Sequence, residues 1–465
     1  MKLHVIGIGG TGMRGIAEIA SAKGHLVTGS DLKRSSNVDK LEKKGIKIFN
    51  EHSKRNVEKV NAIIVSGMID NDNPEILEAK LRHIPIWSRM QGLDRLLHGS
   101  GQRISVIGSV GKTTTTALLE SAFSNGINPT VYMGAESKTT GESGSLGDGR
   151  IAIIESCEYQ GAFFGFRTDN IILTDIVPNH ENYFGTDIDS VSSAFVNFIE
   201  SSLASKVFLP ANIEDNPAFK DLIRDNKVVT YGLHSGSWRA NIISRNHFTT
   251  MFQVQHNNTV AGEFLINMPG DHLVKNLIPG IALAMEFGIS PNVIRDGLLN
   301  ARLPNRRFDV KYQSDHYIGI DDNARNPSQL ASTLSVISRF LPNYRIVVVA
   351  GMWGHLNPRP LHQFAEVLKN VDAVMIADIG RAARSMGGAE DDNAIELLIE
   401  ELANFEVIGV RGISIAQICE KVENLSKDGP VALLTFGYDN YKENFIEIHN
   451  AVISNIKHRF EPANF

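Results

Sequence analysis

The chain of 465 residues contains only two cysteines, Cys157 and Cys419. This count excludes a disulfide-based scaffold and a four-cysteine zinc site, and it is typical of a protein from a reducing compartment. A run of about 18 apolar residues, which a membrane-spanning helix needs, is also missing. The N-terminus reads as a strand and a glycine turn rather than as an apolar signal segment. We therefore expect a cytoplasmic protein that does not bind a membrane.

An excess of positive charge is lacking as well. Lysine and arginine number 46 against 52 aspartates and glutamates, which gives a net charge of -6. A global basic field that could hold nucleic acid is therefore excluded, and any anion-binding site has to be local. The composition, 42% hydrophobic and 21% charged, is typical of a globular enzyme.

Short β-rich apolar runs alternate with helical patterns along almost the whole chain, which is typical of βαβ units and mainly parallel sheets. A polar, glycine-bearing stretch at 98–103 precedes a fresh strand, and another α/β block starts after residues 303–305. We therefore predict an α/β fold of three consecutive domains: a Rossmann-like domain, a central P-loop domain and a second Rossmann-like domain. Their expected bounds are 1–100, 101–303 and 304–465.

Individual strands can be predicted from the same pattern. The expected strands are 3–6, 26–28, 46–49 and 62–66 in the first domain, 104–107, 151–154 and 171–174 in the second, and 346–350, 373–377 and 431–436 in the third. The second domain should also contain an antiparallel pair around a turn at 256–259 and a helix near 272–287.

A phosphate-binding loop is predicted where the strand 104–107 ends. Its glycines allow backbone N–H groups to point at phosphate oxygens, and the helix start adds its positive end. Lys112 supplies a point charge, and Thr113 can place its hydroxyl on Mg²⁺. Val106 stands where the full P-loop pattern has glycine, so this is a shorter variant. The residues expected to bind ATP here are Gly108, Ser109, Val110, Gly111, Lys112, Thr113 and Thr114.

A second glycine loop, residues 7–12, also follows a strand and opens a helix, and Asp31 ends the next strand about twenty residues on. Alone, this pattern fits an NAD-dependent oxidoreductase. A dehydrogenase has no need of the phosphate loop that follows about a hundred residues later. The two loops together favour a nucleotide-linked substrate on the first domain and ATP on the second.

Taken in order, these motifs resemble the Mur ligase family over nearly the whole chain, and most closely its branch that joins L-alanine to UDP-N-acetylmuramate. The glycine loop with Met13, the Gly29-Ser30-Asp31 segment and Asn73-Pro74-Glu75 look like that branch's UDP-sugar domain. The resemblance implies three α/β domains and a UDP-linked acid as substrate. The acceptor-binding residues that it implies are Gly9, Gly10, Thr11, Gly12, Met13, Asp31 and Ser66.

The resemblance also implies magnesium ligands. Glu155 follows the strand 151–154 and matches the family's acidic segment, where a carboxylate is needed because a triphosphate and a substrate carboxylate repel each other. Glu158 should lie nearer the substrate. His180 matches a family histidine that contacts a second Mg²⁺, although Asn179 stands where aspartate is usual. A lone loop histidine is otherwise more often structural.

Further nucleotide contacts are implied near the second and third domains. Asn276 matches the family's helix start on the adenine side of ATP. Arg307, favoured over Arg306 in an Arg-Arg-Phe junction, should reach the γ-phosphate, since a planar charge suits developing negative charge. Asp322 should contact, from the third domain, the ribose of the nucleotide or the nucleotide-binding loop.

The residues that would face the incoming amino acid are Arg325, His355 and Arg359, of which Arg359 could clamp its carboxylate. Asn323 and Arg325 replace the family's usual tyrosine and histidine, and Leu356 stands where the branch often has arginine. These departures fall on the amine side of the expected site.

The implied enzyme is an ATP-dependent acid–amino-acid ligase of cell-wall peptide synthesis that works through an acyl phosphate, with Lys112, Glu155, His180 and Arg307 as catalytic residues and ATP and Mg²⁺ as cofactors. It would act as a monomer or homodimer, without nucleic acid. Two relatives of the same class stay open: a ligase that adds a whole peptide, and an archaeal pseudomurein-type ligase with another UDP-linked acceptor. A P-loop ATPase switch and an NAD-dependent oxidoreductase are the alternatives of other classes.

Overall fold

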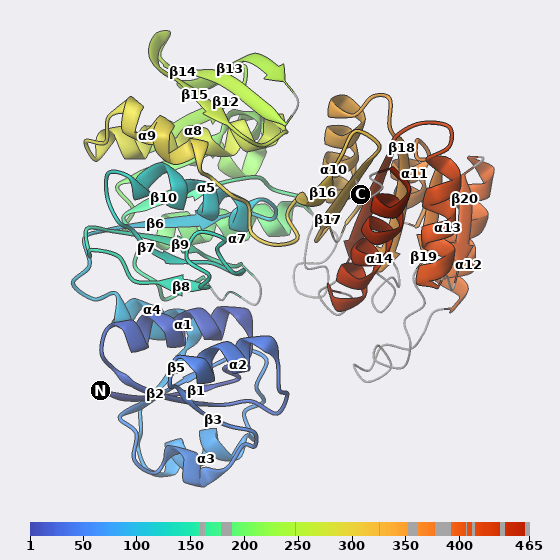
Figure 1. Cartoon of the computed structure of the whole chain (residues 1–465). Coiled ribbons are helices and arrows are strands. Elements are labelled where there is room, and N and C mark those ends of the chain that lie inside the picture. Colours follow the sequence, from blue (N-terminus) through green and yellow to red (C-terminus); the bar gives the residue numbers. More distant parts are fainter. Residues whose placement is uncertain are drawn as a thin grey trace, which may run out of the picture. The chain divides into compact units, whose positions relative to one another are not determined.

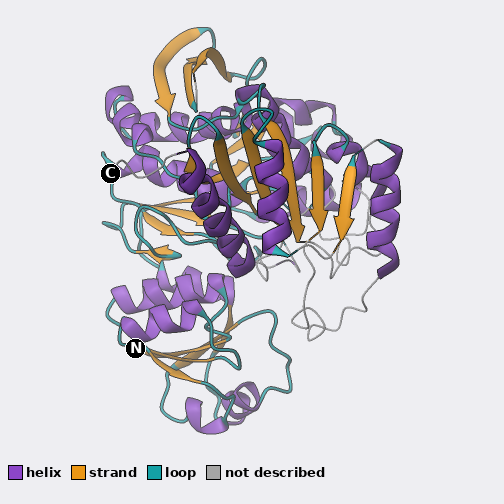
Figure 2. Cartoon of the chain, turned by 45° about the vertical axis from the view of Figure 1, so that its right-hand side comes forward, coloured by secondary structure: helices purple, strands orange, loops and turns teal. Residues whose placement is uncertain are grey.

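The structure is a computed structural model that describes residues 1–158, 161, 163–177, 188–246, 248–324, 326–351, 361–376, 392–405, 407–411, 414–437 and 442–460. Three sheets flanked by helices make up the chain (Figures 1 and 2). The predicted α/β fold class with three domains is thereby confirmed. Contacts divide the chain into two compact units, Met1–Pro304 and Asn305–Phe465. Of the helices in the described ranges, none is long and apolar enough to cross a bilayer.

The first sheet has five parallel strands in the order β3-β2-β1-β4-β5. Its elements are β1 (Lys2–Ile6), α1 (Thr11–Ala22), β2 (Leu26–Ser30), α2 (Ser36–Lys43), β3 (Lys47–Phe49), the 3₁₀ helix η1 (Lys54–Val57), β4 (Ala62–Val65), α3 (Pro74–Leu81), β5 (Ile86–Ser88) and α4 (Arg89–Leu96). The chain runs outward from β1 to β3 and then returns to β4 on the other side of β1. The carboxyl ends of β1 and β4 therefore form a topological switch point, where α/β sheets bind ligands. The first glycine loop lies at this end.

Local sequence signals fix several helix starts in this domain. Asn73 accepts a hydrogen bond from the Glu75 amide, with proline at the first helical position of α3. Ser88 and Gln91 form a reciprocal capping box at the start of α4. The second cap starts α4 directly after β5, whereas eight residues separate α3 from β4.

The second sheet has ten strands in the order β15-β14-β13-β12-β11-β10-β6-β9-β7-β8. Its strands are β6 (Gln102–Ile107), β7 (Thr130–Tyr132), β8 (Gly144–Ser145), β9 (Ile151–Glu155), β10 (Asn170–Leu173), β11 (Lys206–Pro210), β12 (Val228–Gly232), β13 (Trp238–Asn246), β14 (Thr249–His256) and β15 (Thr259–Ile266). Its helices are α5 (Lys112–Ser124), α7 (Ile188–Ser201), η3 (Ala211–Asp215), η4 (Pro217–Phe219), η5 (Leu222–Arg224), α8 (Asp271–Glu286) and α9 (Pro291–Leu299). Strands β6, β9 and β10 are neighbours and parallel, so their carboxyl ends meet at one edge.

The predicted antiparallel pair around 256–259 is confirmed as β14 and β15, and the helix expected near 272–287 is α8. In β14 buried and less buried residues alternate, as expected for a strand with one face on the core. The sequence pattern did not single out β13, the nine-residue partner of β14.

The first two sheets share one hydrophobic core. A single cluster of buried residues joins Leu3, Val5 and Ile16 of the first sheet and its helix to Tyr132 and Ile154 of the second sheet. Helix α1 packs against β8 and α4 (Figure 1). Residues near 100 therefore separate two sheets but not two compact units.

The third sheet has six strands in the order β16-β17-β21-β18-β19-β20. Its elements are β16 (Asp309–Gln313), β17 (Tyr317–Asp322), α10 (Pro327–Phe340), β18 (Arg345–Gly351), α11 (Leu361–Leu368), β19 (Ala373–Ile376), α12 (Asp392–Asn404), β20 (Ile408–Arg411), α13 (Ile415–Leu425), β21 (Val431–Gly437) and α14 (Lys442–Phe460). Every residue of β17 and β21 is buried, as expected for interior strands. This unit has a core of its own.

Candidate functional site

The phosphate loop at the end of β6 is held open by its glycines. Gly108 and Gly111 have φ values of 133° and 86°, a region that residues with a Cβ rarely adopt. A Cβ on Gly108 would lie only 2.2 Å from Oγ1 of Thr174. The amide of Ser109 donates to the carbonyl oxygen of Asp175 at 2.8 Å. The segment after β10 thus closes the loop from the neighbouring strand.

Lys112 is the first residue of α5, and no side chain caps this helix start. Its Nζ lies 2.8 Å from a carboxylate oxygen of Glu158 and donates to the carbonyl oxygen of Gly108. Burial lowers the pKa of Lys112, but Glu158, Cys157 and other acidic neighbours outweigh it and raise the pKa above its ordinary value. The side chain is therefore a permanent cation at the helix start, where a phosphate would bind.

Thr113 and Glu155 bring two oxygen donors together beside this loop. The Thr113 hydroxyl donates to Oε1 of Glu155 at 2.8 Å, and the Gly134 amide donates to Oε2 at 2.6 Å. Hydroxyl and carboxylate oxygens suit Mg²⁺, which usually takes one or two protein ligands and completes its shell with phosphate oxygens and water. No group of three or more His, Cys, Asp or Glu side chains that could hold a metal ion occurs within the described ranges. The two oxygen donors of Thr113 and Glu155 fit a magnesium ion that is bound together with a nucleotide.

Asn276 lies at the same loop, although it is 165 residues further along the chain. It is buried in α8, and a Cβ on Gly111 would lie 3.0 Å from its Nδ2. Leu273, which replaces the family's usual asparagine, is buried in the hydrophobic core. The structure thus brings Asn276 to the phosphate loop and leaves Leu273 with a packing role.

The first glycine loop is closed by backbone and carboxylate oxygens of β2 and its end. Amides of Gly7 and Ile8 donate to the Ser30 carbonyl oxygen at 2.9 and 3.2 Å. Asp31 accepts from the Gly9 amide at 2.9 Å and from the Lys33 amide at 3.0 Å. Both carboxylate oxygens of Asp31 are therefore engaged by backbone amides.

Other predicted acceptor residues surround the same loop. The Cβ of Ser66 lies 3.1 Å from where a Cβ on Gly7 would be. Gly10, Thr11 and Gly12 form the exposed or part-exposed start of α1, which no side chain caps. Met13 is different, because its side chain is buried in the shared core. Only the backbone of Met13 can face a ligand.

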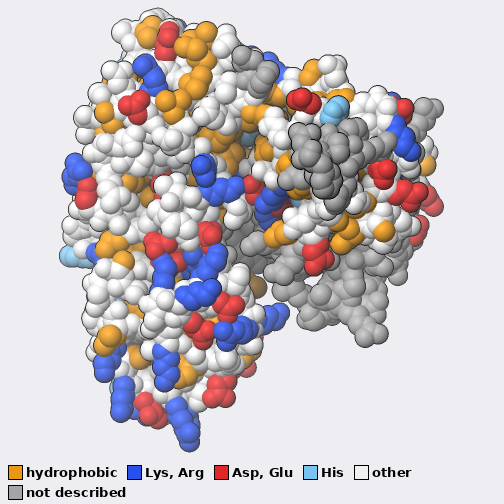
Figure 3. Space-filling view, in the orientation of Figure 1, with side chains coloured by type: hydrophobic (Ala, Val, Ile, Leu, Met, Phe, Trp, Pro, Cys, Tyr) orange, Lys and Arg blue, Asp and Glu red, His pale blue; other side chains and the backbone are white. Residues whose placement is uncertain are grey.

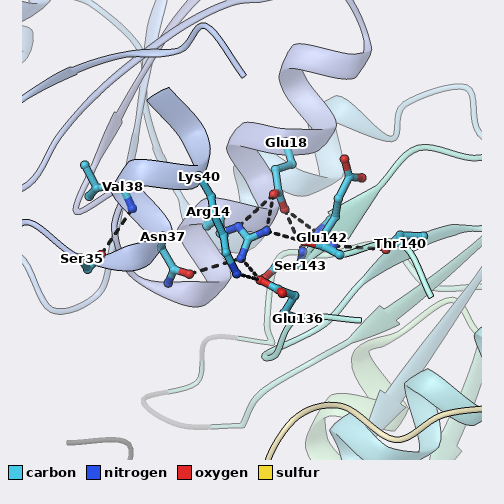
Figure 4. Close-up of polar contacts among 12 residues, drawn as sticks. Arg14, Glu18, Ser35, Asn37, Val38, Lys40, Glu136, Thr140, Glu142 and Ser143 are labelled. Atoms are coloured by element: carbon cyan, nitrogen blue, oxygen red, sulfur yellow. Dashed lines mark hydrogen bonds and ion pairs between the residues drawn. The ribbon is translucent and has the colours of Figure 1, made fainter. Parts of the chain in front are cut away.

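A buried ion-pair cluster fixes α1 against the second domain (Figure 4). Arg14 pairs with Glu18 at 2.9 Å, and each side chain is 1% exposed. Arg14 also donates to the Glu136 carboxylate at 2.6 Å and to the Gly141 carbonyl oxygen at 2.7 Å. Glu136 and Gly141 lie 122 and 127 positions from Arg14 along the chain.

The cluster continues on both sides of this pair. Glu18 accepts from the amides of Ser143 and Gly144 at 2.8 and 3.1 Å. Asn37 accepts from Arg14 at 3.3 Å and donates to the Gly9 carbonyl oxygen at 2.9 Å. The cluster therefore connects the first glycine loop to the segment between β7 and β8, whose Gly134 holds Glu155.

Charged side chains also meet at the surface of this junction. Lys40 pairs with Glu136, and Lys44 pairs with Glu142. These four side chains are between 26% and 42% exposed. Figure 3 shows acidic and basic side chains interspersed over the drawn face of this unit.

In the second compact unit, Arg306 and Arg307 have different surroundings. Arg306 is 3% exposed, pairs with Asp321 at 3.1 Å and donates to the Gly437 carbonyl oxygen at 2.7 Å. Arg307 is part-exposed. The geometry therefore gives Arg306 a structural role, and the phosphate contact of Arg307 stays a prediction.

Asp322 ends β17 and accepts a hydrogen bond from the Phe308 amide at 2.7 Å. Burial raises the pKa of Asp322 to about 6, against the opposing effects of this hydrogen bond and of Arg307. A carboxylate that is costly to bury without a ligand is typical of functional sites. Four other predicted residues, His180, Arg325, His355 and Arg359, lie outside the described residues.

Sequence reasoning missed Arg14 and Glu18, whose partners are distant in sequence and follow no local pattern. It also missed Arg89, which directly follows β5 and therefore lies at the carboxyl end of the first sheet. Its position after a parallel strand was a usable signal, because ligands gather at this edge.

Three family models match the chain in order. They are the catalytic domain of the Mur ligase family at residues 2–100, the Mur ligase middle domain at 106–284 and the glutamate ligase domain of Mur ligases at 306–434. A UDP-N-acetylmuramate–L-alanine ligase of Geobacter sp. (strain M21) is 30% identical over 447 residues, which cover 94% of this chain and 95% of that protein.

Solved structures show the same fold. The UDP-N-acetylmuramate–alanine ligase of Thermotoga maritima matches with a TM-score of 0.78 and 23% identity over 98% of this chain and 99% of that chain. A murein peptide ligase of Psychrobacter arcticus matches with a TM-score of 0.65 and 20% identity over 98% of each chain. With three domain models in sequence and a relative aligned over nearly its full length, the chain belongs to the Mur ligase family.

Proposed function

We propose that the protein is an ATP-dependent ligase that joins the carboxylate of a UDP-linked acceptor, such as UDP-N-acetylmuramate, to the amine of an amino acid in cell-wall peptide synthesis. One observation carries this proposal. A loop suited to a diphosphate and a loop suited to a triphosphate with Mg²⁺ are connected through a shared hydrophobic core and a chain of polar contacts. The name of the Geobacter relative agrees with this chemistry.

The reaction has two steps. An acceptor carboxylate oxygen attacks the γ-phosphorus of ATP, the bond to the β-phosphate bridging oxygen breaks, and ADP leaves. The amine nitrogen then attacks the carbonyl carbon of the acyl phosphate and loses a proton, and phosphate leaves with the electrons of the C–O bond. Positioning and charge stabilisation supply most of the catalysis in phosphoryl transfer.

The residues divide by role. The cation of Lys112 would bind the transferred phosphate, while Thr113 and Glu155 would hold Mg²⁺, whose charge offsets the repulsion between triphosphate and carboxylate. His180 and Arg307 are proposed to complete this set. The remaining proposed contacts are Gly108, Ser109, Val110, Gly111, Thr114, Asn276 and Asp322 for ATP, Gly9, Gly10, Thr11, Gly12, Met13, Asp31 and Ser66 for the acceptor, and Arg325, His355 and Arg359 for the amino acid.

The second loop argues against an NAD-dependent oxidoreductase, because such an enzyme has no need of a lysine and a metal site for a triphosphate. Asp31 does not distinguish the two classes, since each of its oxygens accepts from one backbone amide and keeps lone pairs for a ligand hydroxyl. A peptide-adding ligase remains the closer rival, because Asn323 and Arg325 depart from the alanine-adding pattern. Domain bounds near 1–100, 101–303 and 304–465, a cytoplasmic location and a monomer or homodimer complete the proposal.

Phosphate release tests the proposed reaction. The protein is incubated with ATP, Mg²⁺ and UDP-N-acetylmuramate, and then with single amino acids or with a murein tripeptide. We expect release only when acceptor and amine are both present, and the amine that supports turnover identifies the second substrate. ATP turnover without the acceptor would instead indicate an ATPase switch.

Lys112→Ala tests the site itself. Loss of the ammonium should lower turnover by at least about 100-fold, since it removes a charge that faces the transferred phosphate. Lys206→Ala is the matched control, because Lys206 is part-exposed and pairs with Glu286 in the same domain. Activity of Lys112→Ala near that of Lys206→Ala would contradict the assignment.

A further inference from the structure

The connecting segment between β7 and β8, residues 133–143, is fixed to the ATP-binding domain at two places. The Gly134 amide donates to Oε2 of Glu155, the proposed magnesium ligand, at 2.6 Å. The Ser137 hydroxyl donates at 2.7 Å to Glu120 of α5, the helix that begins at the phosphate loop. Hydrogen bonds of this kind orient a metal-binding carboxylate from outside the ligand shell.

The connecting segment is also closed on itself. The Ser137 amide donates to the Glu142 carbonyl oxygen, and the Gly141 amide donates to the Ser137 carbonyl oxygen, both at 2.9 Å. The Ser137 hydroxyl accepts from the amides of Thr139 and Thr140 at 3.0 and 3.4 Å. Because these bonds tie its two halves together, we expect the segment to move as one piece.

Glu136 fixes the connecting segment to the acceptor-binding domain (Figure 4). Its carboxylate accepts from Arg14 of α1 at 2.6 Å and pairs with Lys40 of α2. Burial raises the pKa of Glu136, but the hydrogen bonds from Arg14 and Lys40 outweigh it and lower the pKa below its ordinary value. The side chain is therefore charged at neutral pH and holds two helices of the first domain.

Arg14 carries this connection to the first glycine loop. Its Nη1 donates to Glu136 and, at 3.3 Å, to Oδ1 of Asn37. Nδ2 of Asn37 donates to the Gly9 carbonyl oxygen at 2.9 Å, while the Gly9 amide donates to Asp31. Both polar groups of the Gly9 backbone are therefore held, and one of them is held by a side chain that contacts Arg14.

We propose that Glu136 is a positioning residue that couples the acceptor site to the magnesium site. This inference rests on the proposed function and adds to it a residue that acts through others. An acceptor bound at the first glycine loop orders Asn37, and through it Arg14 and Glu136. The connecting segment then keeps the Gly134 amide on the carboxylate of Glu155. Because coupling between binding sites is reciprocal, Mg²⁺ and ATP tighten acceptor binding by the same factor.

Glu136 can be altered without dismantling the junction. The pair of Arg14 and Glu18 is 1% exposed, and Glu18 also accepts from the amides of Ser143 and Gly144, so α1 stays fixed to β8. Glu136 itself is 26% exposed. Glu136→Gln keeps the size of the side chain and removes its charge, so it tests coupling rather than assembly.

Glu142→Gln is the matched control. Glu142 belongs to the same connecting segment and also pairs with a lysine of α2, Lys44. In the part of the chain that the structure describes, Glu142 forms no ion pair with Arg14. Its loss therefore removes a junction charge without cutting the connection to the first glycine loop.

Calorimetric titration of the full chain with a non-hydrolysable ATP analogue and Mg²⁺ tests the inference. The titration is made without and with saturating UDP-N-acetylmuramate, and the ratio of the two Kd values measures the coupling. For the unaltered protein we expect the acceptor to lower the Kd of the analogue by about 5- to 50-fold. In Glu136→Gln the ratio should fall below about twofold, whereas Glu142→Gln should keep the ratio of the unaltered protein. Asn37→Ala cuts the connection beside Gly9 and should give the same loss.

A purely structural role for Glu136 would weaken both Kd values equally and leave their ratio unchanged, which would overturn the inference. Equal ratios in Glu136→Gln and Glu142→Gln would overturn it too. So would an unaltered protein that binds both ligands without any effect of one on the other, and the proposed function would then stand. Failure of the unaltered protein to bind the analogue or the acceptor would remove the proposed function and the inference with it. If Glu136→Gln does not fold, Asn37→Ala carries the same comparison and the same outcomes.

Discussion

Glu75 is a buried carboxylate on which the first domain should depend strongly. It is 0% exposed. One of its oxygens accepts from His4 at 3.2 Å and from Asn56 at 2.7 Å, and the other lies 2.7 Å from the Ser30 hydroxyl and 2.9 Å from His52. Burial raises the pKa of Glu75, but the hydrogen bonds from His4, Ser30 and Asn56 outweigh it and lower the pKa to about 2.

This lowered pKa can be converted into stability. The ordinary value is 4.5, and each tenfold change in proton affinity corresponds to about 1.4 kcal/mol, so the carboxylate stabilises the native state by about 3 kcal/mol. Because the native pKa is depressed, the contribution is complete above the ordinary value. It is lost as the pH falls from about 4.5 toward 2. Glu75→Gln imitates the protonated form and should remove it at every pH.

Hydrogen–deuterium exchange of the β1 and β2 amides measures this effect within one domain of a multidomain protein. At pH 7 we expect Glu75→Gln to speed exchange, relative to the intrinsic rate, on the order of 100-fold. The difference should shrink below pH 4.5. Glu78→Gln on the same helix is the control, because it removes an ion pair with the exposed Arg82, and exposed ion pairs contribute little to stability. The reasoning fails if both variants exchange alike at pH 7, or if the Glu75→Gln difference is undiminished at pH 3.

Three further variants probe the rest of the site. Gly144→Ala would place a Cβ 2.0 Å from the Gly15 carbonyl oxygen. We therefore expect the free energy of unfolding, measured by thermal denaturation, to fall by about 2 to 4 kcal/mol. An unfolding transition like that of the wild type would refute this. Thr113→Val removes the hydroxyl that faces Glu155. Half-maximal activity should then need at least about tenfold more Mg²⁺, while UDP binding is unchanged. An unaltered dependence of activity on Mg²⁺ concentration would contradict this. Asp322→Asn removes a carboxylate whose pKa burial raises to about 6. A raised carboxyl pKa means that the native state loses stability as the pH rises through that pKa. Asp322→Asn should therefore be up to about 3 kcal/mol more stable than the parent at pH 7 and similar to the parent below pH 4. Equal stability of the two proteins at pH 7 would refute this prediction.

The sequence predicts most of the parallel sheets, because their strands are apolar runs followed by turns. The strand expected at 104–107 is β6, extended to Gln102–Ile107, and the run at 431–436 is β21, Val431–Gly437. The two glycine loops could be located for the same reason, since each begins where a buried strand ends. Strand β13 was missed because its partner, β14, decides its pairing.

The junction between the first two domains could not be predicted. A Cβ on Gly144 would lie 2.0 Å from the Gly15 carbonyl oxygen, and a Cβ on Gly15 would lie 2.9 Å from the Ser143 carbonyl oxygen, yet nothing near either glycine in sequence indicates this contact. The pairing of Arg14 with Glu136 joins residues 122 positions apart. Such contacts depend on how whole elements pack, so periodicity within an element carries no information about them.

The two glycine loops use the same backbone chemistry but are completed by different side chains. At the second loop, Lys112, Thr113 and Glu155 provide a cation and two oxygen ligands for a metal, as a triphosphate requires. The first loop has neither a lysine nor a hydroxyl–carboxylate pair at the corresponding positions, and its carboxylate, Asp31, is bound by its own backbone. An anion there has to find its countercharge on another element, and Arg89 is the arginine that reaches Gly12. The different completion of two similar loops therefore suits them to different ligands.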